Sequence, residues 1–347
     1  MNAVAANFPH ARPRRLRRSA ALRELVAETR LSVNDLVAPL FVREGISAPQ
    51  PILSLPGVMQ HTVASLLDEV RLLVRLGVKA VILFGVPAHK DAIGSGAFDP
   101  QGIVQVALRA LHAEFGDRIV LMSDTCVDEY TDHGHCGVLD AHGQVDNDLT
   151  LDLYARAAVA QADAGSHVVA PSGMMDGQVG AIRAALDAAG HTGVAILAYS
   201  AKYASGLYGP FRDAVDVQIA DGGDRKGYQQ DWRNAREALT EVEADIAQGA
   251  DMVMVKPALS YLDVIVAVRA LTNLPVAAYH VSGEYAMIKA AAANGWIDHD
   301  VVALEQLTAI KRAGADVILT YFTRWFAERA AAQASGDPSA STPGGAL

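Results

Sequence analysis

The chain is poor in cysteine and lacks long apolar runs. Its 347 residues include only Cys126 and Cys136, too few for the disulfide framework of a small secreted protein. No apolar run approaches the ~18 residues of a membrane span. Arg23, Glu24 and Glu28 interrupt the N-terminal stretch where a signal peptide would need an apolar core. A reduced, cytoplasmic protein without a membrane partner is therefore expected.

The chain also lacks an excess of positive charge. Its formal net charge is −10, and phosphate binding needs clustered cations, so no nucleic-acid partner is expected. Cations cluster only in an N-terminal arm that contains Arg12, Arg14, Arg15, Arg17, Arg18 and Arg23. We expect this arm to pack on a neighbouring subunit; a nucleic-acid or membrane tail is the alternative.

Short apolar runs that alternate with amphipathic stretches are abundant. Eight runs are typical of buried strands, at 36–42, 78–85, 118–124, 166–172, 193–200, 250–257, 275–282 and 315–322. Helical patterns separate most of them, for example at 62–76, 101–115, 152–164, 232–248 and 283–294. This alternation predicts an α/β protein with a (β/α)₈ barrel, and a doubly wound open sheet is the rival. No GxGxxG follows the first strand, which counts against the rival.

The barrel is expected to span residues 35–332, after an extended arm at 1–34. Residues 333–347 are small, polar and rich in Pro and Gly, which predicts a disordered tail.

A (β/α)₈ barrel carries its chemistry at the carboxyl ends of its strands. The predicted ends are an unusually reactive set: Asp124, Ser172, Lys202, Lys256, Ser282 and Tyr321. A lysine beside an apolar wall or a second cation loses its proton more easily and becomes a nucleophile for ketones. Lys202 and Lys256 therefore predict a site for two carbonyl substrates. Structural lysines in salt bridges are the alternative.

One loop after the third predicted strand concentrates groups that bind metals. It reads SDTCVDEYTDHGHCG and contains Asp124, Cys126, Asp128, His133, His135 and Cys136. Thiolate, imidazole and carboxylate ligands suit Zn²⁺. The spacing is not that of a zinc finger, and a polar loop with two incidental thiols is the alternative.

A second loop, at 211–230, is cationic and polar. Its candidates for holding a carboxylate are Arg212, Arg225, Lys226 and Gln229. Gly222, Gly223 and Gly227 would let the loop close as a lid. A solvated surface loop is the alternative.

At these residues the chain closely resembles the porphobilinogen synthases, also called δ-aminolevulinic acid dehydratases. The matching stretches include DTCVDEYTDHGHCGVLD, APSGMMDGQVGAIRAALD, YSAKYASGLYGPFRDA, GADMVMVKP and IKRAGADVILTYF, within residues 12 to about 322. The resemblance implies a barrel whose arm embraces a neighbour in a homo-octamer. It also implies a hydro-lyase of tetrapyrrole (heme) synthesis that condenses two 5-aminolevulinate molecules into porphobilinogen with loss of two waters.

The resemblance assigns chemical roles by position. Lys256 would form the Schiff base with the substrate that becomes the propionyl (P) side. Lys202 would do the same, or act as an acid/base partner, for the acetyl (A) side. Asp124 and Ser172 would handle the A-side amine and protons.

The resemblance also assigns both carboxylate sites. Ser282 and Tyr321 would hold the P-side carboxylate. Arg212, Arg225 and Gln229 would hold the A-side carboxylate, and the closing lid would protect the imines from water.

One departure from the family pattern concerns the metal. Zinc-dependent members use three cysteines in the 123–137 loop; here Cys126 and Cys136 match the outer two, and Asp128 replaces the middle one. We expect a weaker Zn²⁺ site that exchanges more readily with Mg²⁺. Glu241 matches the glutamate with which many members bind an activating Mg²⁺ at a subunit interface. An exposed helix glutamate is the alternative.

Two other functions remain as alternatives. A class I aldolase or related Schiff-base lyase would explain one lysine, but neither the second nor the cysteine-containing loop. A non-catalytic barrel for metal binding or assembly would predict the loss of a strand-end group, and none is missing.

Overall fold

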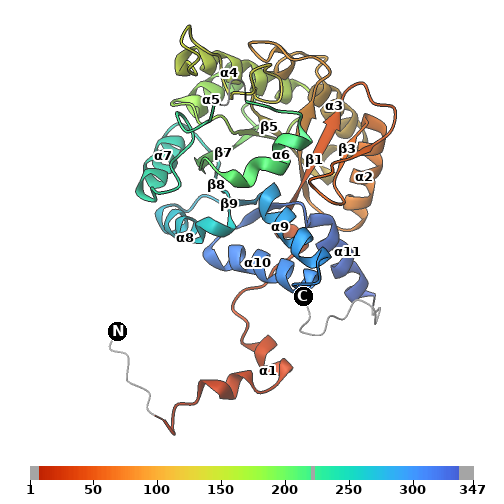
Figure 1. Ribbon diagram of the computed structural model, residues 1–347, viewed down its shortest axis with the longest axis vertical. Helices are drawn as coiled ribbons and strands as arrows, with labels where there is room; N and C mark the ends of the chain where they lie inside the picture. The colour runs from red at the N-terminus through yellow and green to blue at the C-terminus, as the bar shows by residue number, and fades with distance from the viewer. Residues whose placement is uncertain (1–7, 220–222, 336–347) are drawn as a thin grey trace.

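A closed parallel barrel forms the body of the protein in a computed structural model, which describes residues 8–219 and 223–335 (Figure 1). Its strands are β1 (Leu36–Arg43), β4 (Ala80–Val86), β5 (Val120–Thr125), β6 (Val168–Pro171), β7 (Ala195–Lys202), β8 (Met252–Lys256), β9 (Val276–His280) and β10 (Val317–Thr320). They pair in this order, and β10 pairs back to β1 through Ile318 opposite Leu36. The (β/α)₈ prediction is confirmed and the open sheet is excluded.

Helices surround this barrel (Figure 1). The ring contains α2 (Val63–Arg75), α3 (Ile103–Phe115), α4 (Asn147–Asp163), α5 (Gln178–Ala188), α7 (Arg236–Ala247), α8 (Leu262–Leu271), α9 (Ser282–Ala293), α10 (His299–Ala313) and α11 (Thr323–Ala334). All five helices named from the sequence are present. Helix α4 begins five residues before the predicted 152, because Asp146 caps it by accepting a hydrogen bond from the Leu149 amide.

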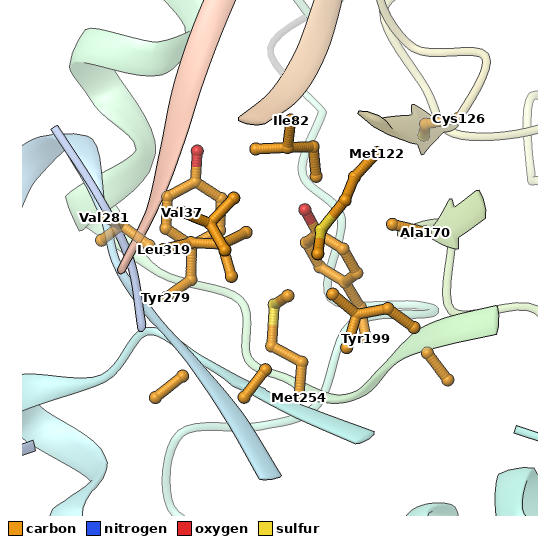
Figure 2. Close-up of a cluster of buried hydrophobic side chains, with 14 of the residues drawn as sticks. Val37, Ile82, Met122, Cys126, Ala170, Tyr199, Met254, Tyr279, Val281 and Leu319 are labelled. Carbon is orange, nitrogen blue, oxygen red and sulfur yellow. The ribbon is translucent and has the colours of Figure 1, made fainter. Parts of the chain in front are cut away.

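Strand residues are buried on both faces of the barrel wall, as parallel strands covered by helices require. In β1, Ala38, Leu40 and Val42 pack outward with apolar residues of α2 such as Leu66. Val37 belongs to the interior cluster. Figure 2 shows interior side chains meeting inside the barrel, among them Val37, Ile82, Met122, Tyr199, Met254, Tyr279 and Leu319. This packed interior leaves the carboxyl ends of the strands for chemistry.

Three smaller elements were not predicted. Strands β2 (Gln50–Pro51) and β3 (Met59–His61) form a short antiparallel pair beside β1. They are too short to produce a periodic sequence signal. Helix α6 (Gly209–Ala214) follows β7 and lies over the open end of the barrel (Figure 1).

The N-terminal arm stands away from the barrel (Figure 1). It contains a 3₁₀ turn at Pro13–Arg17 and helix α1 (Ala20–Leu25), and neither has a buried residue. The predicted C-terminal tail lies almost entirely outside the described residues. Within the described ranges, none of the helices has the length and apolar character that crossing a membrane requires.

Candidate active site

Lys202 and Lys256 end neighbouring strands and are register partners across the β7–β8 ladder. A bulge makes this possible, because β7 advances three residues between Ala198 and Ala201 while β8 advances two. Successive side chains of a strand alternate between its faces. Without the extra residue, Ala201 would pair with Lys256 and Lys202 would point to the opposite face. The bulge therefore brings both lysines to one cavity at the barrel mouth.

Lys256 is buried among aromatic rings. Its Nζ lies 4.6 to 5.3 Å from the ring centroids of Tyr279, Tyr199, Tyr208 and Phe211. Burial and the charge of Lys202 lower the pKa of Lys256 to about 7, against the opposing effect of Asp124. An amine with this pKa is substantially neutral near pH 7 and can attack a ketone.

Lys202 has a different environment. Its Nζ donates a hydrogen bond to the Ser172 carbonyl. Burial opposes its charge, but Cys136, Cys126 and Asp128 outweigh burial and raise the pKa of Lys202. Lys202 therefore remains a cation at a pH at which Lys256 loses its proton.

Asp124 lies with both lysines in the same cavity. Its Oδ2 accepts a 3.1 Å hydrogen bond from Ser172 Oγ, while its Oδ1 is buried without a hydrogen-bond partner among the described residues. Burial raises the pKa of Asp124 to about 6, although Lys256 and Lys202 oppose the increase. Asp124 also interacts with the Tyr199 hydroxyl, whose pKa is raised by burial and by this carboxylate, and the carboxylate faces the cavity where a ligand amine or proton could bind.

Two guanidinium groups complete the wall of the cavity that holds the lysines. Arg225 is buried, and its Nη2 lies 2.7 Å from both Asp128 Oδ2 and the Gly134 carbonyl oxygen. Burial and the charge of Arg225 lower the pKa of Arg212. The Nε atoms of both arginines lack a partner within the described part of the chain. These donors suit a ligand carboxylate.

The cavity with the lysines is small, about 10 Å³, which is about the room that one water needs. A neighbouring cavity of about 370 Å³ shares Arg212 and Arg225 with it and is also lined by Gln229. Lys226 lines this outer cavity too, but its side chain is exposed and pairs with Asp224 at 3.0 Å. Gly222, one of the predicted lid glycines, lies outside the described residues.

Ser282 and Tyr321 do not line the cavity that holds the lysines. Ser282 Oγ accepts a 3.0 Å hydrogen bond from the Phe211 amide and donates one of 3.2 Å to the Leu207 carbonyl. The hydroxyl of Tyr321 lies 3.2 Å from that of Tyr279, whose ring contacts Lys256. Both residues therefore contact the aromatic surroundings of Lys256.

The loop after β5 brings Cys126, Asp128 and Cys136 together. One ligand atom from each lies within 4.8 Å of the others, and all three residues are buried. Burial opposes ionisation of Cys136, but a hydrogen bond from Cys126 and the charge of Arg225 outweigh it and lower the pKa of Cys136 to about 7. Burial raises the pKa of Cys126. The set offers one readily formed thiolate, a second thiol and a carboxylate.

The two histidines of this loop do not join the metal-ligating group among the described residues. His133 Nε2 lies 3.2 Å from the Ala92 carbonyl oxygen, and His135 Nδ1 lies 3.2 Å from the Tyr228 hydroxyl. The sequence placed them in the cluster because spacing alone does not show where a loop side chain points.

Sequence reasoning missed Glu129. Its side chain lines the lysine cavity, and Oε1 is buried without a hydrogen-bond partner in the described ranges. Burial and the charges of Asp128 and Asp124 raise its pKa. It also forms a second compact group with Asp124 and Cys126. Glu129 stands beside other charged residues in the sequence, which usually indicates an exposed loop.

Glu241 lies on α7, and it does not line the lysine cavity. With Asp176 and Glu237 it lines a separate cavity of about 530 Å³. Burial, Asp176 and Asp245 raise the pKa of Glu241, so negative charge is in excess there.

Comparisons with known proteins match one family over most of the chain. A family model described as delta-aminolevulinic acid dehydratase matches residues 10–329. The delta-aminolevulinic acid dehydratase of Streptomyces coelicolor is 59% identical over 318 residues, or 91% of this chain and 96% of that protein. That of Mycobacterium tuberculosis (strain H37Rv) is 58% identical over 318 residues, with the same coverage of 91% and 96%.

A solved structure is also similar. The delta-aminolevulinic acid dehydratase (porphobilinogen synthase) from Toxoplasma gondii ME49, in complex with the reaction product porphobilinogen, superposes with a TM-score of 0.90 at 45% identity. The match covers 92% of this chain and 91% of that one.

Proposed function

Because the chain belongs to the delta-aminolevulinic acid dehydratase family, and is thus a lyase that condenses two 5-aminolevulinate molecules into porphobilinogen, we propose how the residues at its barrel mouth divide this work. Each substrate carries a ketone, a carboxylate and an amine. The condensation therefore needs an activated carbonyl, a proton acceptor and two sites for carboxylates.

Lys256 activates the P-side ketone. Its neutral Nζ adds to the keto carbon, and loss of one water together with uptake of one proton from a neighbouring acid leaves a protonated imine on the lysine. The observation that carries this assignment is the position of Lys256 among four aromatic rings, with its pKa lowered to about 7. The imine withdraws electrons, so the adjacent carbon loses a proton more easily.

Lys202 and Asp124 handle charge and protons on the A side. Lys202 remains protonated, which suits an electrostatic and acid role better than attack on a second ketone. Asp124 offers its unpartnered Oδ1 to a proton or to the substrate amine, and Ser172 fixes the other oxygen.

Two groups of residues hold the carboxylates. Arg212, Arg225 and Gln229 line the outer cavity together and would bind the A-side carboxylate. Ser282 and Tyr321 would bind the P-side carboxylate. Support for this second pair comes from their contacts with the surroundings of Lys256.

Cys126, Asp128 and Cys136 would hold Zn²⁺, which their mixture of sulfur and oxygen ligands fits. When bound, the ion would supply Lewis acidity beside the A-side substrate. The carboxylate makes the site weaker for zinc than three thiolates and more open to Mg²⁺. Full activity after treatment with a strong chelator, in protein without zinc by elemental analysis, would contradict this assignment.

Glu241 would contribute to a second, activating Mg²⁺ site. Its surplus of negative charge, shared with Asp176 and Glu237, supports binding of a hard divalent cation. Titration of metal-free protein with Mg²⁺, for wild type and Glu241→Gln, tests this site.

We also propose a cytoplasmic homo-octamer that acts in tetrapyrrole (heme) synthesis. Exposed Leu16 and Leu25 on the arm support its packing on another subunit, because a lone chain would leave these side chains in water. Sedimentation of the full chain and of a chain without residues 1–34 tests this assembly, since removal of the arm should yield smaller species.

One experiment tests the catalytic assignment. The protein is incubated with 5-aminolevulinate, quenched with borohydride and mapped by mass spectrometry. We expect a reduced adduct on Lys256, and pyrrole in the unquenched control. A class I aldolase would give an adduct without pyrrole, and absence of both under varied Mg²⁺ and Zn²⁺ would refute the assignment.

A further inference from the structure

Asp128 belongs to two sites at once. Its Oδ2 lies 2.7 Å from Arg225 Nη2, in an ion pair whose side chains are only 5% and 7% exposed. The same carboxylate lies in the buried group with Cys126 and Cys136. A single side chain thus separates the guanidinium that faces the substrate cavities from the place where a metal would bind.

Arg225 is held on one edge and free on another. Its Nη2 also donates a 2.7 Å hydrogen bond to the Gly134 carbonyl, in the loop that carries Cys136. Its Nε is buried and without a partner among the described residues. The guanidinium of Arg225 is therefore anchored to the loop that carries Cys136, and its Nε remains able to donate a hydrogen bond to another ligand.

We infer that Asp128 couples the two sites, so that a divalent metal at Cys126 and Cys136 and a carboxylate ligand at Arg225 each tighten the binding of the other. The inference rests on the proposed function, which gives the metal and Arg225 their roles. It goes further by assigning Asp128 as the group through which they communicate.

The direction of coupling follows from charge. Without metal, Asp128 neutralises Arg225 and competes with an incoming carboxylate. A metal ion draws the carboxylate's electrons to itself, which leaves Arg225 with more uncompensated charge for the ligand. A carboxylate bound to Arg225 in turn reduces repulsion between the guanidinium and the metal. Linkage requires the two effects to be equal.

The first test measures zinc affinity by competition with a chromophoric chelator, on the full-length protein. Arg225→Met removes the competing cation, and we expect the Zn²⁺ dissociation constant to fall about tenfold or more. Arg212→Met is the matched control, because Arg212 lies in the same cavity and makes no ion pair with Asp128 in the described structure. It should change the constant less than about threefold.

The second test measures the reciprocal effect. The compound 4-oxopentanoate keeps the substrate's ketone and carboxylate but lacks its amine. The probe is 5-aminolevulinate, added to protein whose Lys256 already carries the borohydride-reduced adduct of 4-oxopentanoate, so that the Arg225 side is the one left free to bind it. Zinc should tighten its binding about fivefold or more in wild type, and this dependence should disappear in Asp128→Asn. Arg225→Lys, which keeps the charge, provides a second variant if Arg225→Met does not fold, and its zinc affinity should stay near that of wild type.

Equal zinc affinities in the Arg225→Met and Arg212→Met proteins would overturn the inference. So would an unchanged zinc dependence of probe binding in Asp128→Asn, or absence of zinc binding in wild type. Formation of pyrrole and of the Lys256 adduct in the same wild-type preparation is scored separately. The experiment can therefore support or refute the proposed catalytic function independently of the coupling.

Discussion

Lys202 pairs with Lys256 across the last step of the β7–β8 ladder, yet the two side chains have opposite shifts in pKa. Lys202 lies near the carboxylate of Asp128 and the thiol of Cys136, which support its charge. Lys256 lies among aromatic rings and receives the repulsion of Lys202. The pair thus provides one cation and one nucleophile from the same residue type.

The first prediction concerns the pH dependence of imine formation. Burial and Lys202 lower the pKa of Lys256 from the ordinary 10.5 to about 7, so its amine is free above about pH 7. The initial rate of adduct formation with 4-oxopentanoate, measured with a common borohydride quench, should rise to about pH 7 and then level off. A rate that continues to rise toward pH 10 would show an unperturbed lysine.

The second prediction isolates the contribution of Lys202. Lys202→Met removes a positive charge, so the pKa of Lys256 should increase and the midpoint of its adduct formation should move to higher pH. Lys202→Arg keeps the charge and is the matched control, for which the midpoint should stay near that of wild type. The same midpoint in all three proteins would mean that burial alone sets the pKa.

The barrel could be predicted from the sequence because its strands are apolar and regularly spaced. The candidate set could be predicted because the chemistry of such barrels lies at strand ends, and Asp124, Ser172, Lys202 and Lys256 do line one cavity. For these four residues, position at the end of a predicted strand was enough to predict that they lie together. The family resemblance was needed to propose roles for Ser282 and Tyr321, which do not line the cavity that holds the lysines.

The bulge in β7 could not be predicted from the sequence. The run through Ala198 and Ala201 is uniformly apolar or small, so nothing in its pattern marks an extra residue. Glu129 was missed for a different reason, because burial of a carboxylate depends on the folded loop around it. For His133 and His135 the sequence misled in the opposite direction. Both belong to a metal-binding residue type, but in the folded loop each lies within hydrogen-bond distance of another group.

The third prediction concerns Asp124. Asp124→Asn keeps the shape of the side chain but cannot take up a proton, so kcat should fall by about a hundredfold or more. Ser172→Ala is the comparison, because it removes only the 3.1 Å hydrogen bond to the other carboxylate oxygen and should have a smaller effect. Steady-state assays of pyrrole formation distinguish the two. A kcat within about threefold of wild type in Asp124→Asn would exclude a role in proton transfer.

Glu284 supports the segments that follow strands β8 and β9, close to Lys256 and Ser282. Its carboxylate is fully buried on α9 and accepts hydrogen bonds from the amides of Leu259, at 2.6 Å, and Val281, at 2.7 Å. Leu259 lies just beyond the end of β8, and Val281 just beyond the end of β9. One side chain therefore ties together the loops that follow the two strands.

The fourth prediction is that Glu284→Gln lowers the free energy of unfolding by about 1–3 kcal/mol, because the amide NH₂ would meet a backbone donor in place of an acceptor. Burial raises the pKa of Glu284 to about 7, although the backbone amides oppose the increase. The folded state therefore binds its proton more tightly than the unfolded state, and wild-type stability should fall as pH rises from about 4.5 to about 7. Chemical denaturation across this range should show a smaller decline in Glu284→Gln. Glu243→Gln, at an exposed glutamate of α7, should match wild type, and an identical pH dependence in all three proteins would contradict the prediction.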